Sequence, residues 1–370
     1  MRKEGMLMWD ETIFRNPELF ELDYLPDRFP HRDTQLDSIR YAIKPALRNT
    51  KPLNCLLYGP PGTGKTSASM KIFQELEDFS DKIVTVKINC QIDSTRFAVM
   101  ARLYQKILGV TPPGSGISFN RIFEKVITKL VETDRTLIAV LDDINYLFYE
   151  GNANEVMYSL LRAHELYPGS RIGVIAIVND PTVIYGFDPR VASVFLPEEI
   201  EFKPYDLYEI DDILSDRIDM GFYPNVVSED VKQEIVRFVA ETGDLRSGID
   251  LLKRSGMNAE KRASTKISSE DVKNAYEASR SNHFARLVKN MNENEQIILK
   301  AVHERSEISS GELYEIFNSL TNIGYTRFYE IVNKMVAAGY INAEFTGKGQ
   351  KGRTRIFKPA FKTDDIKFFK

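Results

Sequence analysis

The sequence contains little cysteine and no long apolar run, and both absences exclude classes of protein. Of its 370 residues only two are cysteines, Cys55 and Cys90, and both lie in apolar, strand-like stretches. We therefore expect two buried thiols rather than a disulfide or a metal site, which favours an intracellular location. No apolar run reaches the roughly 18 residues that span a membrane. Because the N-terminus is charged too early for a secretory signal, we expect a cytoplasmic protein with no membrane partner.

Internal repeats and low-complexity segments are also absent, so repeat architectures are not indicated. The composition, with 43% hydrophobic and 28% charged residues, is that of an ordinary globular protein. A chain of this length can form two or three domains and bury a large core.

Acidic residues are missing from one stretch near the C-terminus, between Phe345 and Thr363. Residues 284–362 carry 12 Lys and Arg against eight Glu and no Asp, a net charge of +4. Because the whole chain has a formal net charge of −4, the remainder carries −8. A basic terminal module on an acidic body suggests a polyanionic partner, although a solvated charged surface explains the charge equally well.

The stretch from Gly59 to Thr66 matches the P-loop pattern and lies between an apolar strand pattern and a helical one. We expect its backbone N–H groups to surround phosphate oxygens at the start of a helix. Lys65 would then reach the β- and γ-phosphates, and the Thr66 hydroxyl would contact Mg²⁺. The predicted nucleotide-binding residues of this loop are Gly59, Pro60, Pro61, Gly62, Thr63, Gly64, Lys65 and Thr66.

Strand and helix patterns alternate through the first half of the chain. Strands are predicted at 54–58, 83–89, 137–141 and 172–178, with helices between them and a lead-in helix at 35–47. This alternation predicts an α/β fold with a parallel sheet, helices on both faces, and ligands at the carboxyl ends of the strands.

The connection from residue 94 to residue 134 is longer than a crossover between parallel strands requires. Its pattern predicts two helices, 95–108 and 119–132, joined by a glycine- and proline-rich loop at 109–118. We therefore expect an insertion with a function of its own.

Polar residues follow two of the predicted strands. We interpret Asp142 as the partner of Mg²⁺ and Asp143 as a candidate general base, although helix-capping aspartates would give the same pattern. Asn179 could orient a water molecule, although Asn-Asp is also common turn chemistry. Arg246 falls in the first turn of a helix, where the helix dipole disfavours a cation. A phosphate contact would explain this arginine, and a surface ion pair is the alternative.

From residue 205 the strand patterns stop. Four helices are predicted at 207–220, 228–242, 245–258 and 268–282, each beginning near a capping residue. They would form a helical domain that follows the sheet.

The last part of the chain predicts a winged helix. Helices are expected at 284–291, 294–304, 310–317 and 325–338, followed by short strands at 341–345 and 354–357. The last helix would enter the DNA major groove, and the basic hairpin would reach phosphates or the minor groove. The candidate DNA-binding residues are Tyr325, Thr326 and Arg327 on the helix and Lys348, Lys351, Arg353 and Arg355 on the hairpin.

Together these features resemble one family, the archaeal origin-recognition and replication-initiator AAA+ ATPases, which is related to the eukaryotic origin recognition complex. The resemblance covers nearly the whole chain, in the family's order of ATPase base, helical lid and winged helix. It is carried by the P-loop, Leu141-Asp142-Asp143, the strand before Asn179, Leu25-Pro26 with His31-Arg32, Asp188-Pro189-Arg190-Val191 and Gly243-Asp244-Leu245-Arg246.

The resemblance implies a role for each matching position. Asp142 and Asp143 would form the Walker B pair, with Asn179 as sensor 1 and Arg246 as sensor 2. Arg190 would be the arginine finger offered to a neighbouring subunit. Pro26, His31 and Arg32 would join the ATP- or ADP-binding residues. The implied domains are an AAA+ ATPase base at 1–204 with the insertion at about 94–134, a helical lid at 205–282 and a winged-helix domain at 283–370.

One departure from the family pattern concerns hydrolysis. The family commonly has Asp-Glu where this chain has Asp142-Asp143, and the side chain of Asp143 is shorter by one methylene. We therefore expect a slow ATPase in which ATP acts mainly as a conformational switch.

The predicted function is that of an ATP-dependent, DNA-binding replication initiator. It would bind double-stranded origin DNA, alone or with further copies or paralogues, and help recruit or load an MCM-type replicative helicase, so it would be nucleoid-associated. A clamp-loader-like AAA+ remodelling ATPase and a nucleotide-gated transcription regulator remain alternatives. ATPase stimulation by a partner protein would favour the first, and binding to promoters would favour the second.

Overall fold

The computed structural model describes residues 12–113, 116–278, 291–337, 340–345 and 355–360. The chain divides into two compact units, residues 1–272 and 273–370. In the described part of the chain, no helix is both long enough and apolar enough to cross a membrane.

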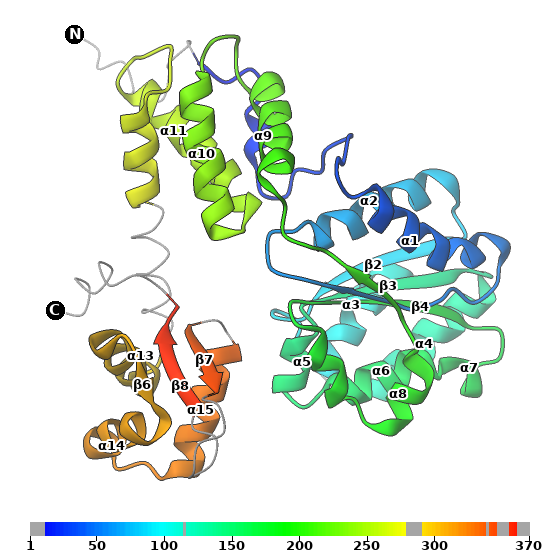
Figure 1. The fold of residues 1–370 in the computed structure, drawn as a ribbon. Coiled ribbons are helices and arrows are strands. Elements are labelled where there is room, and N and C mark those ends of the chain that lie inside the picture. The colour runs from blue at the N-terminus through cyan, green and yellow to red at the C-terminus, as the bar shows by residue number, and fades with distance from the viewer. Residues whose placement is uncertain (1–11, 114–115, 279–290, 338–339, 346–354, 361–370) are drawn as a thin grey trace, which may run out of the picture. The chain divides into compact units, whose positions relative to one another are not determined.

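A parallel sheet of five strands, in the order β2-β3-β4-β1-β5, is the centre of the first unit (Figure 1). The four strands expected from the sequence are present within one residue of their predicted bounds, so the predicted α/β fold is confirmed. The strands are β1 Cys55–Tyr58, β2 Ile83–Asn89, β3 Thr136–Asp142, β4 Arg171–Val178 and β5 Glu198–Glu201.

Both faces of the sheet are apolar because helices cover both. Along β3, Leu137, Ala139 and Leu141 enter one core, whereas Ile138 and Val140 enter the other. Figure 1 shows α1 and α2 on one face and the remaining helices of the sheet region on the other. Their bounds are α1 Asp33–Ile43, α2 Lys65–Phe79, α3 Arg96–Leu108, α4 Phe119–Glu132, α5 Asn145–Tyr149, α6 Ala153–Leu161, α7 Ala163–Leu166 and α8 Pro189–Phe195, with 3₁₀ helices η2 Lys44–Arg48 and η3 Pro181–Gly186.

The two helices of the segment 94–134 begin and end where the sequence predicts. The Thr95 hydroxyl accepts a hydrogen bond from the backbone N–H of Ala98, and the Ser118 hydroxyl accepts one from Arg121. Both caps satisfy N–H groups that the first helical turn leaves unpaired. The buried side chains of α3 and α4 belong to the same core as the sheet. The segment 94–134 therefore contributes to the core of the ATPase sheet.

Two elements differ from the sequence analysis. The predicted helix 35–47 ends earlier, at Ile43, and continues as the 3₁₀ helix η2, which has Pro45 near its start and therefore lacks one backbone donor. The strand β5 was not predicted, because Glu198, Glu199 and Glu201 surround a single buried apolar residue, Ile200. An edge strand with charged side chains has no clear apolar alternation.

A group of helices follows the sheet: α9 Leu207–Gly221, α10 Glu229–Thr242, α11 Leu245–Lys261 and a helix described over 269–278. The N-terminal segment, which includes the 3₁₀ helix η1 Pro17–Phe20, packs against them. The rings of Phe14, Phe20 and Phe222 cluster, with centroids 4.7–5.7 Å apart. The backbone N–H of Arg15 donates to the carbonyl of Gly221 at 2.8 Å. Residues 14–20 thus lie on α9 and α11, although they belong to the stretch 1–204 that the sequence analysis assigned to the base.

Beyond the helix at 269–278, which crosses the boundary between the units, the second unit has three described helices and a small antiparallel sheet. The helices are α13 Glu293–Arg305, α14 Ser310–Thr321 and α15 Tyr325–Ala337. The sheet has the order β6-β8-β7, with β6 Ile308–Ser309, β7 Ile341–Phe345 and β8 Arg355–Pro359. Strand β6, which has two residues, is too short to give a sequence pattern and was not predicted. The arrangement is consistent with the predicted winged helix. The predicted helix 284–291, apart from Met291, and the middle of the basic hairpin lie outside the described residues.

Candidate nucleotide site and candidate DNA-binding residues

The P-loop turn is fixed by glycines in backbone conformations that other residues rarely adopt. Gly59 and Gly62 have φ values of 140° and 76°. A Cβ on Gly59 would lie 2.1 Å from the carbonyl oxygen of Phe202, and one on Gly62 would lie 2.1 Å from Oδ1 of Asp244. The turn ends at Lys65, where α2 begins, so the N-terminus of α2 faces the phosphate-binding position that the sequence predicts.

Lys65 is buried at the base of the turn, with 6% of its surface exposed. Its Nζ donates to the carbonyls of Gly59 at 2.6 Å and Pro60 at 2.8 Å, and to Oδ1 of Asn179 at 3.2 Å. Burial lowers the pKa of Lys65 to about 8, because the charged form is desolvated. A hydrogen bond therefore joins Lys65 of the P-loop to Asn179, the residue that follows β4.

Asp142, at the end of β3, is buried next to the P-loop helix. The Thr66 hydroxyl donates to its two carboxylate oxygens, at 3.0 Å and 3.1 Å. The ammonium of Lys87, on the edge strand β2, lies 3.3 Å from Oδ2 of the same carboxylate. The sequence analysis assigned Asp142 and Thr66 to the same Mg²⁺ ion and did not identify Lys87.

Asp143 has a left-handed backbone conformation, with φ at 55°, which aspartate tolerates better than most residues. Burial raises the pKa of its carboxyl group, and the neighbouring charge of Asp142 raises it further. A raised pKa makes this carboxylate a better proton acceptor than an exposed aspartate.

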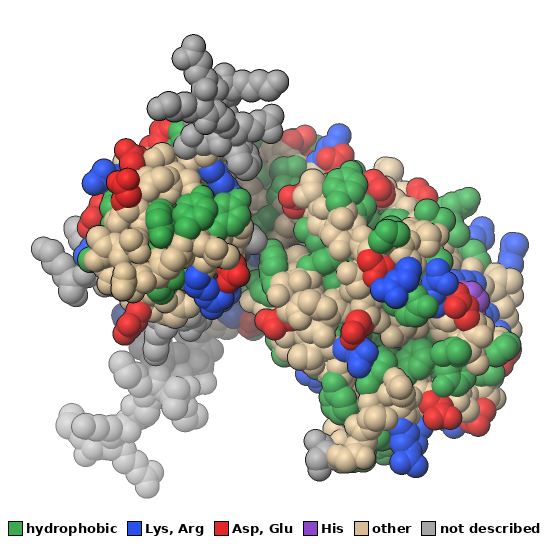
Figure 2. All heavy atoms as spheres, turned by 90° about the horizontal axis from the view of Figure 1, so that it is seen from below, with side chains coloured by type: hydrophobic (Ala, Val, Ile, Leu, Met, Phe, Trp, Pro, Cys, Tyr) green, Lys and Arg blue, Asp and Glu red, His purple; other side chains and the backbone are tan. Residues whose placement is uncertain are grey.

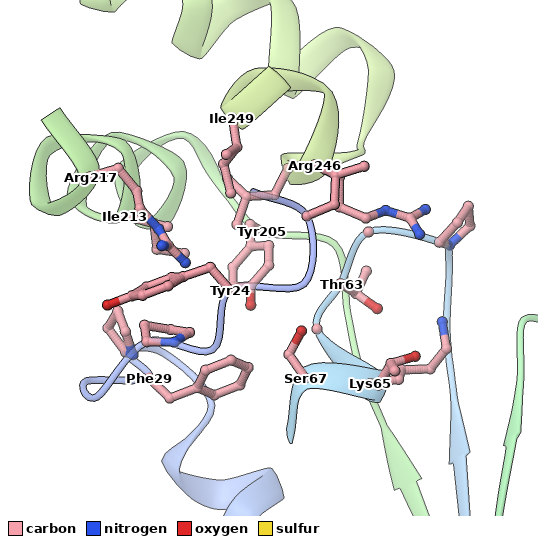
Figure 3. Close-up of a pocket in the computed structure, with 18 of the residues that line it drawn as sticks. Tyr24, Phe29, Thr63, Lys65, Ser67, Tyr205, Ile213, Arg217, Arg246 and Ile249 are labelled. Carbon is pink, nitrogen blue, oxygen red and sulfur yellow. The ribbon is translucent and has the colours of Figure 1, made fainter. Parts of the chain in front are cut away.

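Arg246 extends toward the cavity from the first turn of α11 (Figure 3). Its guanidinium donates to both oxygens of Asp244, at 3.0 Å and 2.9 Å. Asp244 is also the N-cap of α11 and packs on Gly62. Arg246 therefore forms the ion pair that was the alternative explanation, and it also lines the cavity.

These groups surround one cavity of about 340 Å³ between the P-loop and the helical part of the unit, a volume within the range of small-molecule sites. Figure 3 shows Lys65 toward one end, and Tyr24 and Phe29 toward the other, with Arg217 above Tyr24. The guanidinium of Arg217 lies 4.6 Å from the centre of the Tyr24 ring. Lining residues that the sequence analysis missed include Tyr24, Phe29, Ser67, Tyr205, Ile213, Arg217, Met220 and Ile249.

The segment from Leu25 to Arg32, called the lead-in motif below, forms part of the cavity wall and holds that wall in place. Pro26 lines the cavity. Arg32 is buried behind it, where its guanidinium donates to the carbonyl of Thr63 at 3.1 Å and stacks 3.7 Å from the Tyr205 ring centre. His31 lies 2.7 Å from the carboxylate of Asp212 on α9. His31 and Arg32 thus join the P-loop, the lead-in and α9 without being among the residues that line the cavity.

Three other predicted site residues also do not line the cavity. Two of them are Gly59 and Pro60, whose backbone carbonyls accept hydrogen bonds from Lys65. The third is Arg190, which lies on α8. Its side chain is 75% exposed and forms an ion pair with Asp188 at 2.9 Å.

The candidate DNA-binding residues of α15 lie on the surface of the second unit. Tyr325, Thr326 and Arg327 are exposed, and the Arg327 guanidinium pairs with Glu330 at 2.6 Å. Tyr329 is 40% exposed, and its ring stacks on that of Tyr325 with centroids 6.1 Å apart. This exposed aromatic pair extends the predicted surface by a residue that the sequence analysis did not name.

The hairpin residues are described only in part. Lys348, Lys351 and Arg353 lie outside the described residues. Arg355, at the start of β8, donates to the side-chain oxygen of Asn333 and lies 5.3 Å from the Phe357 ring centre. It therefore packs on its own domain.

On the face of the molecule that Figure 2 shows, acidic and basic side chains are interspersed.

Comparisons with known proteins agree with this geometry. Residues 28–175 match the AAA ATPase domain, and residues 211–277 match the Cdc6 AAA+ ATPase-type lid domain. A protein of Methanosarcina mazei named ORC1-type DNA replication protein 2 is 55% identical over 366 residues, which cover 99% of this chain and 98% of that protein. The chain belongs to the family of ORC1-type DNA replication proteins.

Solved structures of ORC proteins have the same fold. The Aeropyrum pernix ORC1 protein in complex with DNA matches with a TM-score of 0.79 and 26% identity, over 97% of each chain. The Aeropyrum pernix ORC2 protein, solved as ADPNP–ADP complexes, matches with a TM-score of 0.70 and 20% identity, over 96% of each chain. With its matches to the AAA ATPase domain and the Cdc6-type lid, the ORC1-type chain described here is an AAA+ ATPase.

The lowered pKa of Lys65 predicts how nucleotide affinity changes with pH. Below about pH 8 the lysine is charged and can pair with phosphate, whereas above it the free protein must take up a proton on binding. We expect the affinity for ATP to fall up to about tenfold per pH unit above that value. Equilibrium titrations between pH 7 and pH 10 measure this slope. In Lys65→Arg, whose side chain stays charged, the slope should vanish, and an equal slope in both proteins would assign the effect to another group.

Proposed function

We propose that this chain is an ATP-dependent replication initiator that binds double-stranded origin DNA and helps recruit or load an MCM-type replicative helicase. One observation carries the proposal: Lys65, Asp142, Asp143 and Arg246 line a single cavity shared by the P-loop and the lid. A nucleotide in that cavity would contact both parts. The proposed domains are the base at 1–204 with its insertion at about 94–134, the lid at 205–282 and the winged helix at 283–370.

We assign the phosphates of the nucleotide to the P-loop. Lys65 would exchange its two carbonyl partners for the β- and γ-phosphates, since an ammonium pairs more strongly with an anion than with a neutral carbonyl. The aromatic side chains of Tyr24, Phe29 and Tyr205 would surround the nucleobase, at the end of the cavity away from Lys65.

The residues present also fit a magnesium ion. Thr66 and Asp142 offer oxygen atoms, which Mg²⁺ prefers, and magnesium in such sites usually has few protein ligands besides phosphates and waters. When bound, the ion would neutralise charge on the phosphates. Asp142 and the Thr66 hydroxyl, already 3.0 Å apart, would hold it.

Asp143 is the proposed general base, and Asn179 the residue that orients the attacking water. The raised pKa of Asp143 suits proton transfer. The contact between Asn179 and Lys65 supports this assignment, because it brings the amide to the phosphate end of the cavity.

Arg246 is the proposed sensor for the γ-phosphate. It would leave Asp244 for the phosphate and so report ATP to the lid through α11. Because the lead-in is tied to α9 by the His31–Asp212 contact, the lid and base would respond together. Hydrolysis would then release this arrangement.

Arg190 is the proposed arginine finger. Its exposure and its place away from the cavity support action on a neighbouring copy or paralogue on DNA. An arginine supplied in this way stabilises charge in the transition state of phosphoryl transfer.

DNA would be contacted at two places. Tyr325, Thr326 and Arg327 would enter the major groove, and the basic hairpin would contact phosphates. The loop 109–118, between α3 and α4, would form the second contact.

The first prediction from this proposal concerns hydrolysis. Asp143→Asn should abolish a slow turnover while ATP still binds, because an amide fits the left-handed backbone at this position but accepts no proton. Asp143→Glu should increase the rate by extending the carboxylate one methylene toward the water. Single-turnover measurements at saturating ATP provide the test. Rates equal to those of the parent in both variants would assign the base elsewhere.

The second prediction concerns DNA recognition. Arg327→Ala should reduce binding to duplexes from mapped replication starts by about 1–3 kcal/mol and have little effect on random duplexes, because arginine pairs well with guanine in the major groove. The matched control is Lys300→Ala, which removes an exposed cation from α13 of the same unit.

Titrations at two salt concentrations separate the outcomes, because phosphate contacts increase the salt dependence. Equal losses on both kinds of duplex would mean that α15 positions the protein without reading sequence. If the parent protein does not prefer origin duplexes over random ones, the proposed recognition of origins is wrong.

A further inference from the structure

Lys87, which belongs to none of the nucleotide-binding motifs named above, forms an ion pair with Asp142. Lys87 lies on β2, the edge strand, and is paired with Val140, while Asn89 is paired with Asp142. Residues two apart in a strand share a face, so Lys87 and Asp142 lie on the same face of the sheet as neighbours on adjacent strands. The Lys87 ammonium approaches Oδ2 of Asp142 to 3.3 Å.

The Asp142 carboxylate is held from two directions. Thr66 donates its hydroxyl from the first turn of α2, and Lys87 supplies an ammonium from β2. The Asp142 side chain is 11% exposed and that of Lys87 is 33% exposed. An exposed ion pair usually contributes little, but a nearly buried carboxylate needs a partner, because its charge is desolvated.

Lys87 also adds to the charge at the metal end of the cavity. Asp142 and Asp143 bring two negative charges there, and Lys87 contacts Asp142 from β2, the edge strand next to β3. The positive charge of Lys87 acts on Asp143 too, where it opposes the rise in pKa caused by burial. A cation fixed at this place attracts phosphate when no metal is bound and repels a divalent ion that approaches Asp142.

We propose that Lys87 is a positioning residue that holds the Asp142 carboxylate and reduces the dependence of nucleotide binding on magnesium. The proposal rests on the nucleotide site assigned above. With Lys87 present, its charge offsets that of Asp142 even without metal, in addition to the charges of Lys65 and Arg246, which line the cavity. Without Lys87, less of the negative charge of Asp142 would be neutralised, and the carboxylate pair would repel the phosphates more strongly unless a divalent ion were bound between them.

The test compares the affinity for a fluorescent ADP analogue in EDTA and in saturating Mg²⁺. The measured quantity is the dissociation constant in EDTA divided by the dissociation constant in Mg²⁺. In Lys87→Met this ratio should be about tenfold larger than in the parent protein. That is the size expected for one partly solvated unit charge a few ångströms from a divalent ion. The Mg²⁺ concentration for half-maximal binding should fall. Lys87→Arg, which keeps the charge, should restore the ratio of the parent.

The matched control is Lys106→Met. Lys106 lines the same surface groove as Lys87 but pairs with Glu77, at 3.5 Å, and not with Asp142. This variant should keep the parent's ratio. Thermal unfolding without nucleotide checks that each variant is folded, and Lys87→Gln provides a second neutral side chain.

Each outcome supports or overturns the proposal. An unchanged ratio in both Lys87→Met and Lys87→Gln overturns it, and so does an equal change in the Lys106 control. A smaller ratio overturns it too, because Lys87 would then increase the dependence of nucleotide binding on magnesium. If the parent does not bind the ADP analogue in either condition, the assignment of the nucleotide site itself is wrong.

Discussion

The close packing of the lid on the phosphate-binding turn is the contact on which the rest of the nucleotide site depends. Asp244 lies so near Gly62 that a Cβ there would come within 2.1 Å of its carboxylate. The turn can therefore have only glycine at this position, and the start of α11 is placed directly over the P-loop. Because Arg246 follows Asp244 in the same helical turn, this packing also brings the lid arginine to the cavity. A nucleotide that entered would touch the base and the lid at once.

The charges of the site explain why an anion would favour this arrangement. Lys65 is buried among carbonyl groups, and burial lowers its pKa. Arg246 forms an ion pair with Asp244, and Lys87 forms one with Asp142. A phosphate chain would offer Lys65 a charged partner in place of neutral carbonyls, and would give Arg246 a second anion in a partly desolvated cavity. The binding free energy would then depend on lid position, which is the condition for a nucleotide-driven switch.

The sequence predicted the parts of the structure that have a local signal. The P-loop, the carboxylates at the end of β3 and the bounds of α3 and α4 were identified because glycine turns, polar strand ends and helical patterns act over a few positions. Strand β5 was missed because its acidic residues hide the apolar pattern. Tyr24 and Arg217 are distant in sequence and meet only through tertiary packing. Lys87 reaches Asp142 through the pairing of β2 with β3, which no motif records.

Amide hydrogen exchange of the full chain, with and without ATP and Mg²⁺, tests most directly whether the base and the lid bind one nucleotide jointly. The account predicts that ATP slows exchange in three separate segments: the P-loop at 59–66, the lead-in at 21–30 and the start of α11 at 244–249. ADP should protect the P-loop with less effect on the start of α11, because Arg246 would lack the γ-phosphate. Protection confined to the P-loop with both nucleotides would contradict the account, since the lid would then take no part in binding.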